Sequence, residues 1–339
     1  IYTQAMQYLD DAIADLQKED LIDPEAQDLL YQGDAEKWLK LAYGLKARYT
    51  MHLLKRSANK DADMEKVLEY VNNSFESAEE QAAFDVYDAN NINPLYGFFV
   101  ARAGLGASES MRSKLAEYND PRLSRAFITK QGTSGKEQAP GTADNAVYAP
   151  NGTPEQGTSK YGTSLFMYSI SAPTLLLSYH ELKFLEAEAL CRLERDAKSA
   201  LKDAVVAGLL NAENSFTISR KELGKTLINA ASSITEAEAE SYFDNTIEAK
   251  YTAEPLKTTM TQKYFALWGA SGEATESYND VRRMKGLGEN FIELKNPNSF
   301  PLRCPYGNSD TTTNAEVKAA YGNGQYVYSE NVWWAGGSR

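Results

Sequence analysis

The feature that most constrains the fold of this chain is the stretch from residue 178 to 210, SYHELKFLEAEALCRLERDAKSALKDAVVAGLL. Its first apolar residues recur at helical spacing and are Tyr179, Leu182, Leu185, Ala189, Leu190 and Leu193. A charged break at residues 194–196 precedes a second run with Ala197, Leu201, Val205 and Leu209. Two amphipathic helices joined by so short a turn are expected to pack antiparallel, and their alanines allow a close approach.

The length and pairing of these two helices resemble a tetratricopeptide unit, whose repeat period is about 34 residues. A single helical hairpin cannot bury its apolar face and needs neighbours. We expect those neighbours to be helices at Tyr2–Leu16 and at residues 38–53, with residues 235–267 closing the bundle.

Composition excludes several classes of partner. The chain has 339 residues and a formal net charge of −12, which argues against binding to nucleic acid or to anionic lipid through a basic patch. A neutral or cationic partner stays open. No apolar run approaches the roughly 18–20 residues that span a bilayer. The two cysteines, Cys191 and Cys304, form no metal-binding pattern with histidines, so no metal or cofactor is expected. Cys191 is expected to be a small core residue, and whether the two cysteines pair stays open.

The first 75 residues predict three helices. The first ends near Asp20, Asp34 caps the second, and Asp63 opens the third. Arg48, His52 and Arg56 recur every four residues on one face of the second helix. They would suit an anion, but a solvated or ion-paired face is favoured.

The middle of the chain loses helical periodicity. Residues 90–96 contain turn-forming residues, followed by two phenylalanines, and a helix resumes only over residues 108–118. Residues 132–162 are rich in Gly, Pro, Ser, Thr and Asn, and Tyr148 and Tyr161 interrupt them. A segment this long is usually either functional or flexible, and both interpretations stay open.

The last third of the chain predicts two helices and a loop-like tail. Thr235 and Glu238 form a capping-box pattern, and Pro255 begins the next helix. The charged residues that follow are expected to form an internal ion network rather than a substrate site, and they are Glu276, Asp280, Arg282 and Arg283. From Phe300 onward the chain is expected to be mostly loop.

Five segments, in this order, resemble the SusD/RagB family of outer-membrane nutrient-binding lipoproteins from Bacteroides-type bacteria. They are GDAEKWLKLAYGLKARYTMHLLKR from Gly33, SYHELKFLEAEAL from Ser178, TQKYFALWG with the downstream YNDVRR, FPLRCPYGNSDTTTN from Phe300, and the terminal VWW. The family's signal peptide, lipid-bearing N-terminal Cys and first hairpin are not in this sequence, so we expect an N-terminally truncated member. A Glu that such proteins commonly carry near Ser309 and Asp310 is also absent.

This resemblance implies a mainly α fold of tetratricopeptide-like hairpins with long irregular loops. We expect one SusD-like domain over residues 1–339, with a helical scaffold at 1–75, a ligand-binding region at 76–177, tetratricopeptide-like helices at 178–270 and a loop-rich end at 271–339. It also implies a non-catalytic protein on the cell surface that captures oligosaccharides or polysaccharides and passes them to a SusC-like TonB-dependent transporter. Attachment to the outer membrane would be through an N-terminal lipid anchor that this chain does not include.

The ligand contacts are predicted in the loops at residues 93–99 and 148–168. The chain has 21 tyrosines, whose rings stack on sugars while their hydroxyls form hydrogen bonds. The candidate residues are Tyr96, Phe98, Tyr148, Tyr161 and Tyr168. The bland alternative is that these aromatic rings only hold loops against the core.

Two other functions stay open. A glycoside hydrolase would need two carboxylates roughly 5–10 Å apart, and among 47 acidic residues chance pairs abound. No acid stands in a recognisable catalytic motif. A tetratricopeptide-type adaptor would show hairpins at a fixed period, whereas here only one unit is clear.

Overall fold

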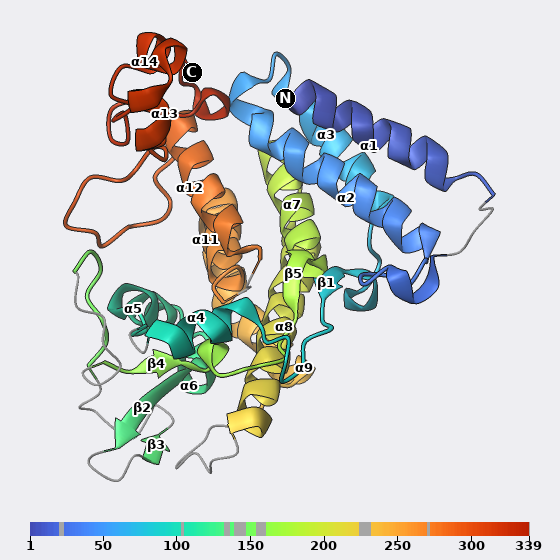
Figure 1. Ribbon diagram of the computed structural model, residues 1–339. Coiled ribbons are helices and arrows are strands. Elements are labelled where there is room, and N and C mark those ends of the chain that lie inside the picture. Colours follow the sequence, from blue (N-terminus) through green and yellow to red (C-terminus); the bar gives the residue numbers. More distant parts are fainter. Residues whose placement is uncertain are drawn as a thin grey trace.

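The computed structural model describes residues 1–19, 24–102, 105–131, 136–138, 147–153, 161–223, 232–269 and 272–338. Helices dominate these residues and the strands are short, which confirms the predicted mainly α class. Figure 1 shows long helices on one side and a smaller, mixed part of the chain below them.

The predicted hairpin forms the centre of the helical part. Helix α7 spans Tyr179–Arg192, and the hydroxyl of Ser178 accepts a hydrogen bond from the backbone N–H of Glu181 at its start. Helix α8 spans Lys198–Leu223 and extends well beyond the predicted end at residue 210. The pair is antiparallel, because α8 starts near the end of α7 and its Gly208, ten residues further on, lies against the beginning of α7 at His180. The buried side chains between them include Phe184, Leu201 and Leu209.

Three N-terminal helices pack in sequence onto this hairpin (Figure 1). Helix α1 (Tyr2–Leu16) lies on α2 (Ala35–His52), α2 lies on α3 (Lys60–Asn72), and α3 lies on α7. The hairpin's main neighbour on this side is therefore α3 rather than the expected Tyr2–Leu16 helix. The cap at Asp34 is confirmed, since its carboxylate accepts from the backbone N–H of Lys37 at 3.1 Å.

Two predicted boundaries in this region differ from the structure. Helix α3 is capped by Asn59, whose side chain accepts from the backbone N–H of Ala62, so the prediction that Asp63 opens it was wrong. Helix α1 ends at Leu16, and Asp20 lies outside the described residues.

The opposite side of the hairpin is covered by α9 (Glu236–Tyr242), α10 (Glu248–Ala253) and α11 (Pro255–Ala266). The capping box of Thr235 and Glu238 is present, and Pro255 occupies the first turn of α11 as predicted. A π-helical turn at Phe243–Ile247 separates α9 from α10. It brings both Phe243 and Ile247 into the core.

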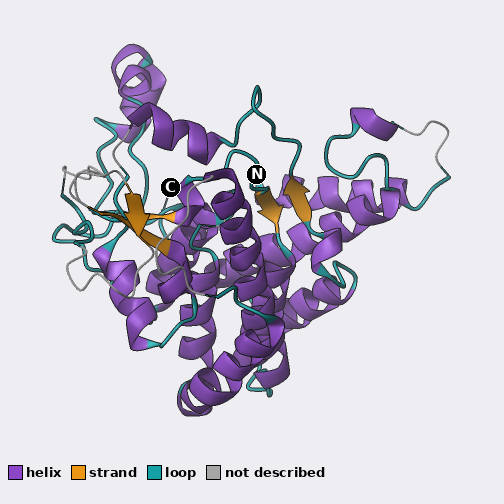
Figure 2. Ribbon diagram, turned by 90° about the horizontal axis from the view of Figure 1, so that it is seen from below, coloured by secondary structure: helices purple, strands orange, loops and turns teal. Residues whose placement is uncertain are grey.

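A two-stranded pair closes off the middle of the chain. Strand β1 (Ala82–Phe84) pairs antiparallel with β5 (Thr174–Leu177). The chain between the two strands therefore begins and ends at the same place in the fold. They contain α4 (Pro94–Arg102), α5 (Glu109–Glu117) and α6 (Arg122–Ala126). Strand β2 (Phe127–Gln131) lies between β3 (Lys136–Gln138) and β4 (Thr163–Ser164). Figure 2 shows this small sheet apart from the β1–β5 pair.

Two segments predicted as loops are helical. Residues 94–102 form α4, and the tail after α12 (Ala274–Leu287) contains α13 (Asn308–Thr313) and α14 (Ala315–Tyr321). No strand forms in the described part of the tail.

The predicted ion network is confirmed in part: Asp280 and Arg283 form buried ion pairs, whereas Arg282 lies over the rings of Tyr278 and Trp334. Arg283 on α12 bonds both carboxylate oxygens of Glu188 on α7, at 2.5 and 2.8 Å, and also Asp280 at 2.7 Å. Lys263 on α11 pairs with Asp280 at 2.8 Å. On α2, Arg48 pairs with Glu181, so this part of the Arg48–His52–Arg56 face is ion-paired rather than solvated. These bonds join four helices across the centre of the scaffold.

Cys191 and Cys304 are both free thiols, and Cys191 packs partly buried against the core of α7 and α8. The described helices include none that is long and apolar enough to cross a membrane. Within the same residues, no cluster of three or more metal-binding side chains forms.

Candidate functional site

Helix α4 and the residues just before it carry exposed apolar side chains. The side chain of Phe98 on the helix is 50% exposed, and Val100 on the helix and Ile92 before it are also exposed. Tyr96 is half-buried on the same helix. These exposed apolar side chains make this part of the chain a candidate binding surface. We use the name α4 aromatic face for four residues, Ile92 just before the helix and Tyr96, Phe98 and Val100 on it.

Asn93 fixes the start of α4, although its sequence context is that of a turn. The buried amide of Asn93 donates to the carbonyl of Ala172 at 2.7 Å, and its backbone N–H donates to the carbonyl of Ile170 at 2.8 Å. Its side-chain oxygen accepts from the backbone N–H of Leu95 at 2.8 Å. Asn93 thereby caps the helix and ties it to the chain leading to β5.

That chain is held in turn by the end of α8. The carboxylate of Glu222 accepts from the hydroxyls of Ser169 and Ser171 and from the backbone N–H of Ile170. A continuous set of hydrogen bonds therefore runs from the long hairpin helix to the base of α4. The scaffold positions the α4 aromatic face rigidly, as a binding surface requires.

The structure separates the five predicted ligand residues into two groups. Tyr96 and Phe98 lie on α4, and Tyr168 lies half-buried against the same helix, with its ring centroid 5.0 Å from that of Phe99. Tyr148 and Tyr161 are only 4% and 8% exposed. The ring of Tyr148 packs against Phe127 and under the guanidinium of Arg112.

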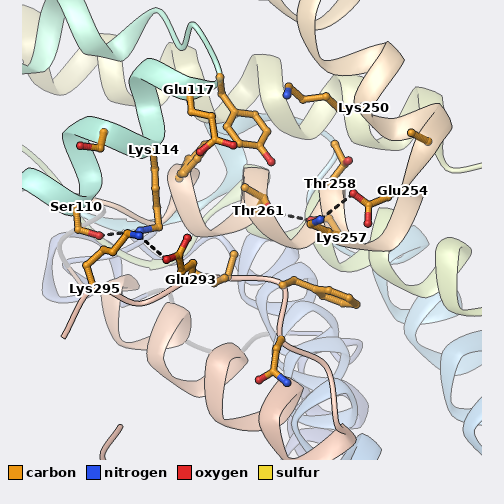
Figure 3. A pocket seen from close by; sticks show the side chains of 17 residues that line it. Ser110, Lys114, Glu117, Lys250, Glu254, Lys257, Thr258, Thr261, Glu293 and Lys295 are labelled. Carbon is orange, nitrogen blue, oxygen red and sulfur yellow. Dashed lines mark hydrogen bonds and ion pairs between the residues drawn. The ribbon is translucent and has the colours of Figure 1, made fainter. Parts of the chain in front are cut away.

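A pocket of about 660 Å³ opens on another side, between α5, the α10–α11 pair and residues 290–295. Figure 3 shows side chains from these three segments converging on it. Its lining mixes hydroxyls, charges and half-buried rings, the rings being those of Tyr118 and Phe291 together with buried Phe265. Ligand pockets of proteins have this size and this mixture of apolar wall and convergent polar groups.

The pocket gathers cations in an acidic protein. Among the described residues that line it are four lysines, Lys114, Lys250, Lys257 and Lys295. Two are neutralised locally, since Lys257 pairs with Glu254 at 2.8 Å and Lys295 pairs with Glu293. The other two form no ion pair with any residue that the structure describes. We call this cavity the lysine pocket.

The lysine pocket was not predicted from the sequence. Its walls come from residues 110–118, 250–265 and 290–295, which are far apart in the chain and share no motif. The one available signal is the lysine spacing on α10 and α11, and such spacing is ordinary on a solvated helix.

The glycoside hydrolase alternative calls for a general acid at a binding surface. A glycosidase needs a carboxylic acid with a raised pKa beside its substrate. Among the described carboxyl groups only that of Glu273 has a clearly raised pKa, and it is fully buried by the scaffold. In the lysine pocket, the hydrogen bond and charge of Lys295 lower the pKa of Glu293, which is the wrong direction for a general acid.

Comparison with known proteins shows the family. Residues 1–306 match the model of a SusD-like family described as starch-binding associating with outer membrane. The chain belongs to this SusD-like family. The resemblance seen in the sequence is thus confirmed, together with the SusD-like fold.

Solved structures agree with this assignment. A SusD/RagB family protein from Bacteroides thetaiotaomicron VPI-5482 is 66% identical with a TM-score of 0.95, and the match covers 100% of this SusD-like chain and 72% of that one. A SusD homologue from Bacteroides fragilis NCTC 9343 is 20% identical with a TM-score of 0.72, over 97% of this chain and 73% of the other. A candidate nutrient-binding outer-membrane protein from Bacteroides vulgatus ATCC 8482 is 20% identical with a TM-score of 0.69, over 98% and 74%. No curated protein matches the chain.

Proposed function

We propose that this SusD-like protein is a non-catalytic nutrient-binding protein that captures oligosaccharides or polysaccharides at the outer membrane. The observation that carries the proposal is the α4 aromatic face, where Phe98 is half exposed and Tyr96, two residues earlier, is half-buried on the same anchored helix. Aromatic side chains at such a surface bury much area with little loss of conformational freedom. The family description, which names starch binding and the outer membrane, supports the same class of ligand.

The site is proposed to consist of Tyr96 and Phe98 as the stacking residues, with Tyr168 supporting α4 from beneath. Tyr148 and Tyr161 remain part of the proposal as candidate contacts, but both rings are buried. Sugar contact by either residue would require its surroundings to open. We therefore place the main binding energy on α4.

The partner proposed for this function is a SusC-like TonB-dependent transporter that receives the captured saccharide. Attachment to the cell surface is proposed through an N-terminal lipid anchor. Both proposals come from the family relationship, whose description places such proteins at the outer membrane.

A titration panel tests whether the protein binds saccharides. Isothermal titration calorimetry with starch oligosaccharides and with other neutral plant and microbial glycans should give saturable binding to at least one of them. Analysis of the same mixtures after long incubation should show no shortened products. Release of shorter saccharides would favour the glycoside hydrolase instead, and absence of binding to the whole panel would reject the proposed function.

A further inference from the structure

We infer that the lysine pocket is a second saccharide site, and that it takes sugars bearing a carboxylate or sulfate group. This inference rests on the proposed saccharide-binding function and adds to it a ligand class and a separate location. The net charge of the chain favours neutral or cationic partners, but the local charge of this pocket points to anionic ones.

Two lysines of the pocket, Lys114 and Lys250, have no carboxylate partner among the described residues. Lys114 reaches from α5 and donates to the hydroxyl of Ser110 at 2.7 Å, as Figure 3 shows. The ammonium group of Lys250 lies over the ring of Tyr118, 4.5 Å from its centroid. An ammonium group that is hydrogen-bonded only to a hydroxyl, or that lies over a ring, gains a charge-assisted hydrogen bond when an anion arrives.

The side chain of Lys114 is partly removed from water. Its side chain is half-buried, and burial lowers the pKa of Lys114 although the charge of Glu293 partly opposes this. The protein therefore does not fully compensate the charge that it has partly removed from water. A carboxylate or sulfate within reach of the ammonium group would restore that compensation.

The pocket has room for a sugar ring as well as for a charged group. It has about 660 Å³ of space, half-buried Tyr118 and Phe291 in its wall, and the hydroxyls of Ser113 and Thr258. The carboxylates in the lining do not cancel the cations, because Glu254 and Glu293 are occupied by Lys257 and Lys295. Glu117 is exposed on α5 and remains the one nearby acid without an ion pair among the described residues. It is expected to disfavour ligands with more than one charge close to α5.

Titration of the protein with three size-matched probes tests this inference. The probes are an oligogalacturonide for the carboxylate, a chondroitin sulfate oligosaccharide for the sulfate, and a neutral maltooligosaccharide. We expect at least one acidic probe to bind wild type with an affinity that falls as NaCl is raised. The double variant Lys114→Met/Lys250→Met should bind it about tenfold or more weakly, since each ammonium loses a charged hydrogen bond. The matched control Lys66→Met removes an exposed lysine of α3 and should leave the affinity unchanged.

The other outcomes separate this inference from the proposed function. Neutral probes that bind while acidic probes do not would overturn the lysine pocket as a site and leave the function intact. An acidic probe that binds wild type and the double variant with equal affinity would also overturn the lysine pocket as a site. Inorganic sulfate that displaces the acidic probe at equal concentration would show a simple anion site and reject a saccharide site. Failure of all three probes and of the neutral panel would reject both proposals. Thermal melts of each variant establish that it is folded.

Discussion

Glu273 is a buried carboxyl group whose charge the surrounding side chains do not neutralise. It accepts from the backbone N–H of Ser178, and Arg48 lies 3.5 Å away, but the guanidinium of Arg48 is already bonded to Glu181. Burial first, and then the charge of Glu181, raise the pKa of Glu273 well above its usual value. The same guanidinium lowers the pKa of Glu181. The protonated form of Glu273 is therefore favoured more than that of a carboxyl group in water.

The substitution Glu273→Gln should stabilise the protein at neutral pH. In the unfolded chain this carboxyl ionises near 4.5, whereas in the fold it stays protonated to higher pH. The free energy of unfolding of wild type therefore loses a contribution as pH rises above 4.5, and the amide removes that loss. Urea unfolding followed by circular dichroism should show the variant above wild type at pH 7, with the difference vanishing below about pH 4.

The exposed substitution Glu79→Gln provides the control and should change little at either pH. A Glu273→Gln variant that is less stable than wild type at every pH would mean that the carboxylate is ionised and paired with Arg48.

Helix packing in the scaffold depends on charge as well as on apolar area. Arg283 of α12 has no exposed surface, and its guanidinium meets Glu188 of α7 and Asp280 of its own helix. Arg192 of α7 also bonds Glu188 and then reaches Glu289. The network thereby joins α12 to α7 through buried ion pairs in addition to apolar contacts.

The substitution Arg283→Met should destabilise the protein by about 3–5 kcal/mol, because it leaves buried carboxylates without a partner. The free energy of unfolding from urea titration measures this directly. Lys66→Met, which breaks an exposed pair at the surface of α3, should cost less than about 1 kcal/mol. Equal effects of the two substitutions would contradict the structural importance of the network.

Element boundaries were predictable where the chemistry is local. Asp34, the capping box at Thr235 and Pro255 mark helix starts through their own side chains. Helix α4 was missed because Asn93, its cap, binds carbonyls almost eighty residues away, a contact that periodicity cannot reveal. Helix α13 was missed because NSDTTT contains weak helix formers, so neighbouring structure must stabilise it.

At the scale of the whole molecule, the candidate ligand residues came from aromatic density alone and stay a prediction. Phe98 is half exposed and Tyr96 half-buried, and nothing in the sequence distinguished them from Tyr148 and Tyr161, which are buried. The lysine pocket was invisible because the total charge of −12 hides a local gathering of cations. Long-range packing decides both cases.

The central claim is that a rigid helical scaffold presents α4 as a saccharide-binding surface. Hydrogen bonds join α8 to α4, because Glu222 of α8 and Asn93 at the start of α4 both bind the backbone of Ile170. The claim therefore requires affinity to depend on the α4 side chains more than on exposed aromatics elsewhere.

The most direct measurement is calorimetric titration of the best neutral glycan against wild type, Tyr96→Ala/Phe98→Ala and Tyr328→Ala. Tyr328 is an exposed aromatic side chain in the tail and serves as the matched control. The account expects the double variant to lose about tenfold or more in affinity, as anchor residues of a binding surface do, and the control to match wild type. Equal affinity in all three proteins would contradict it.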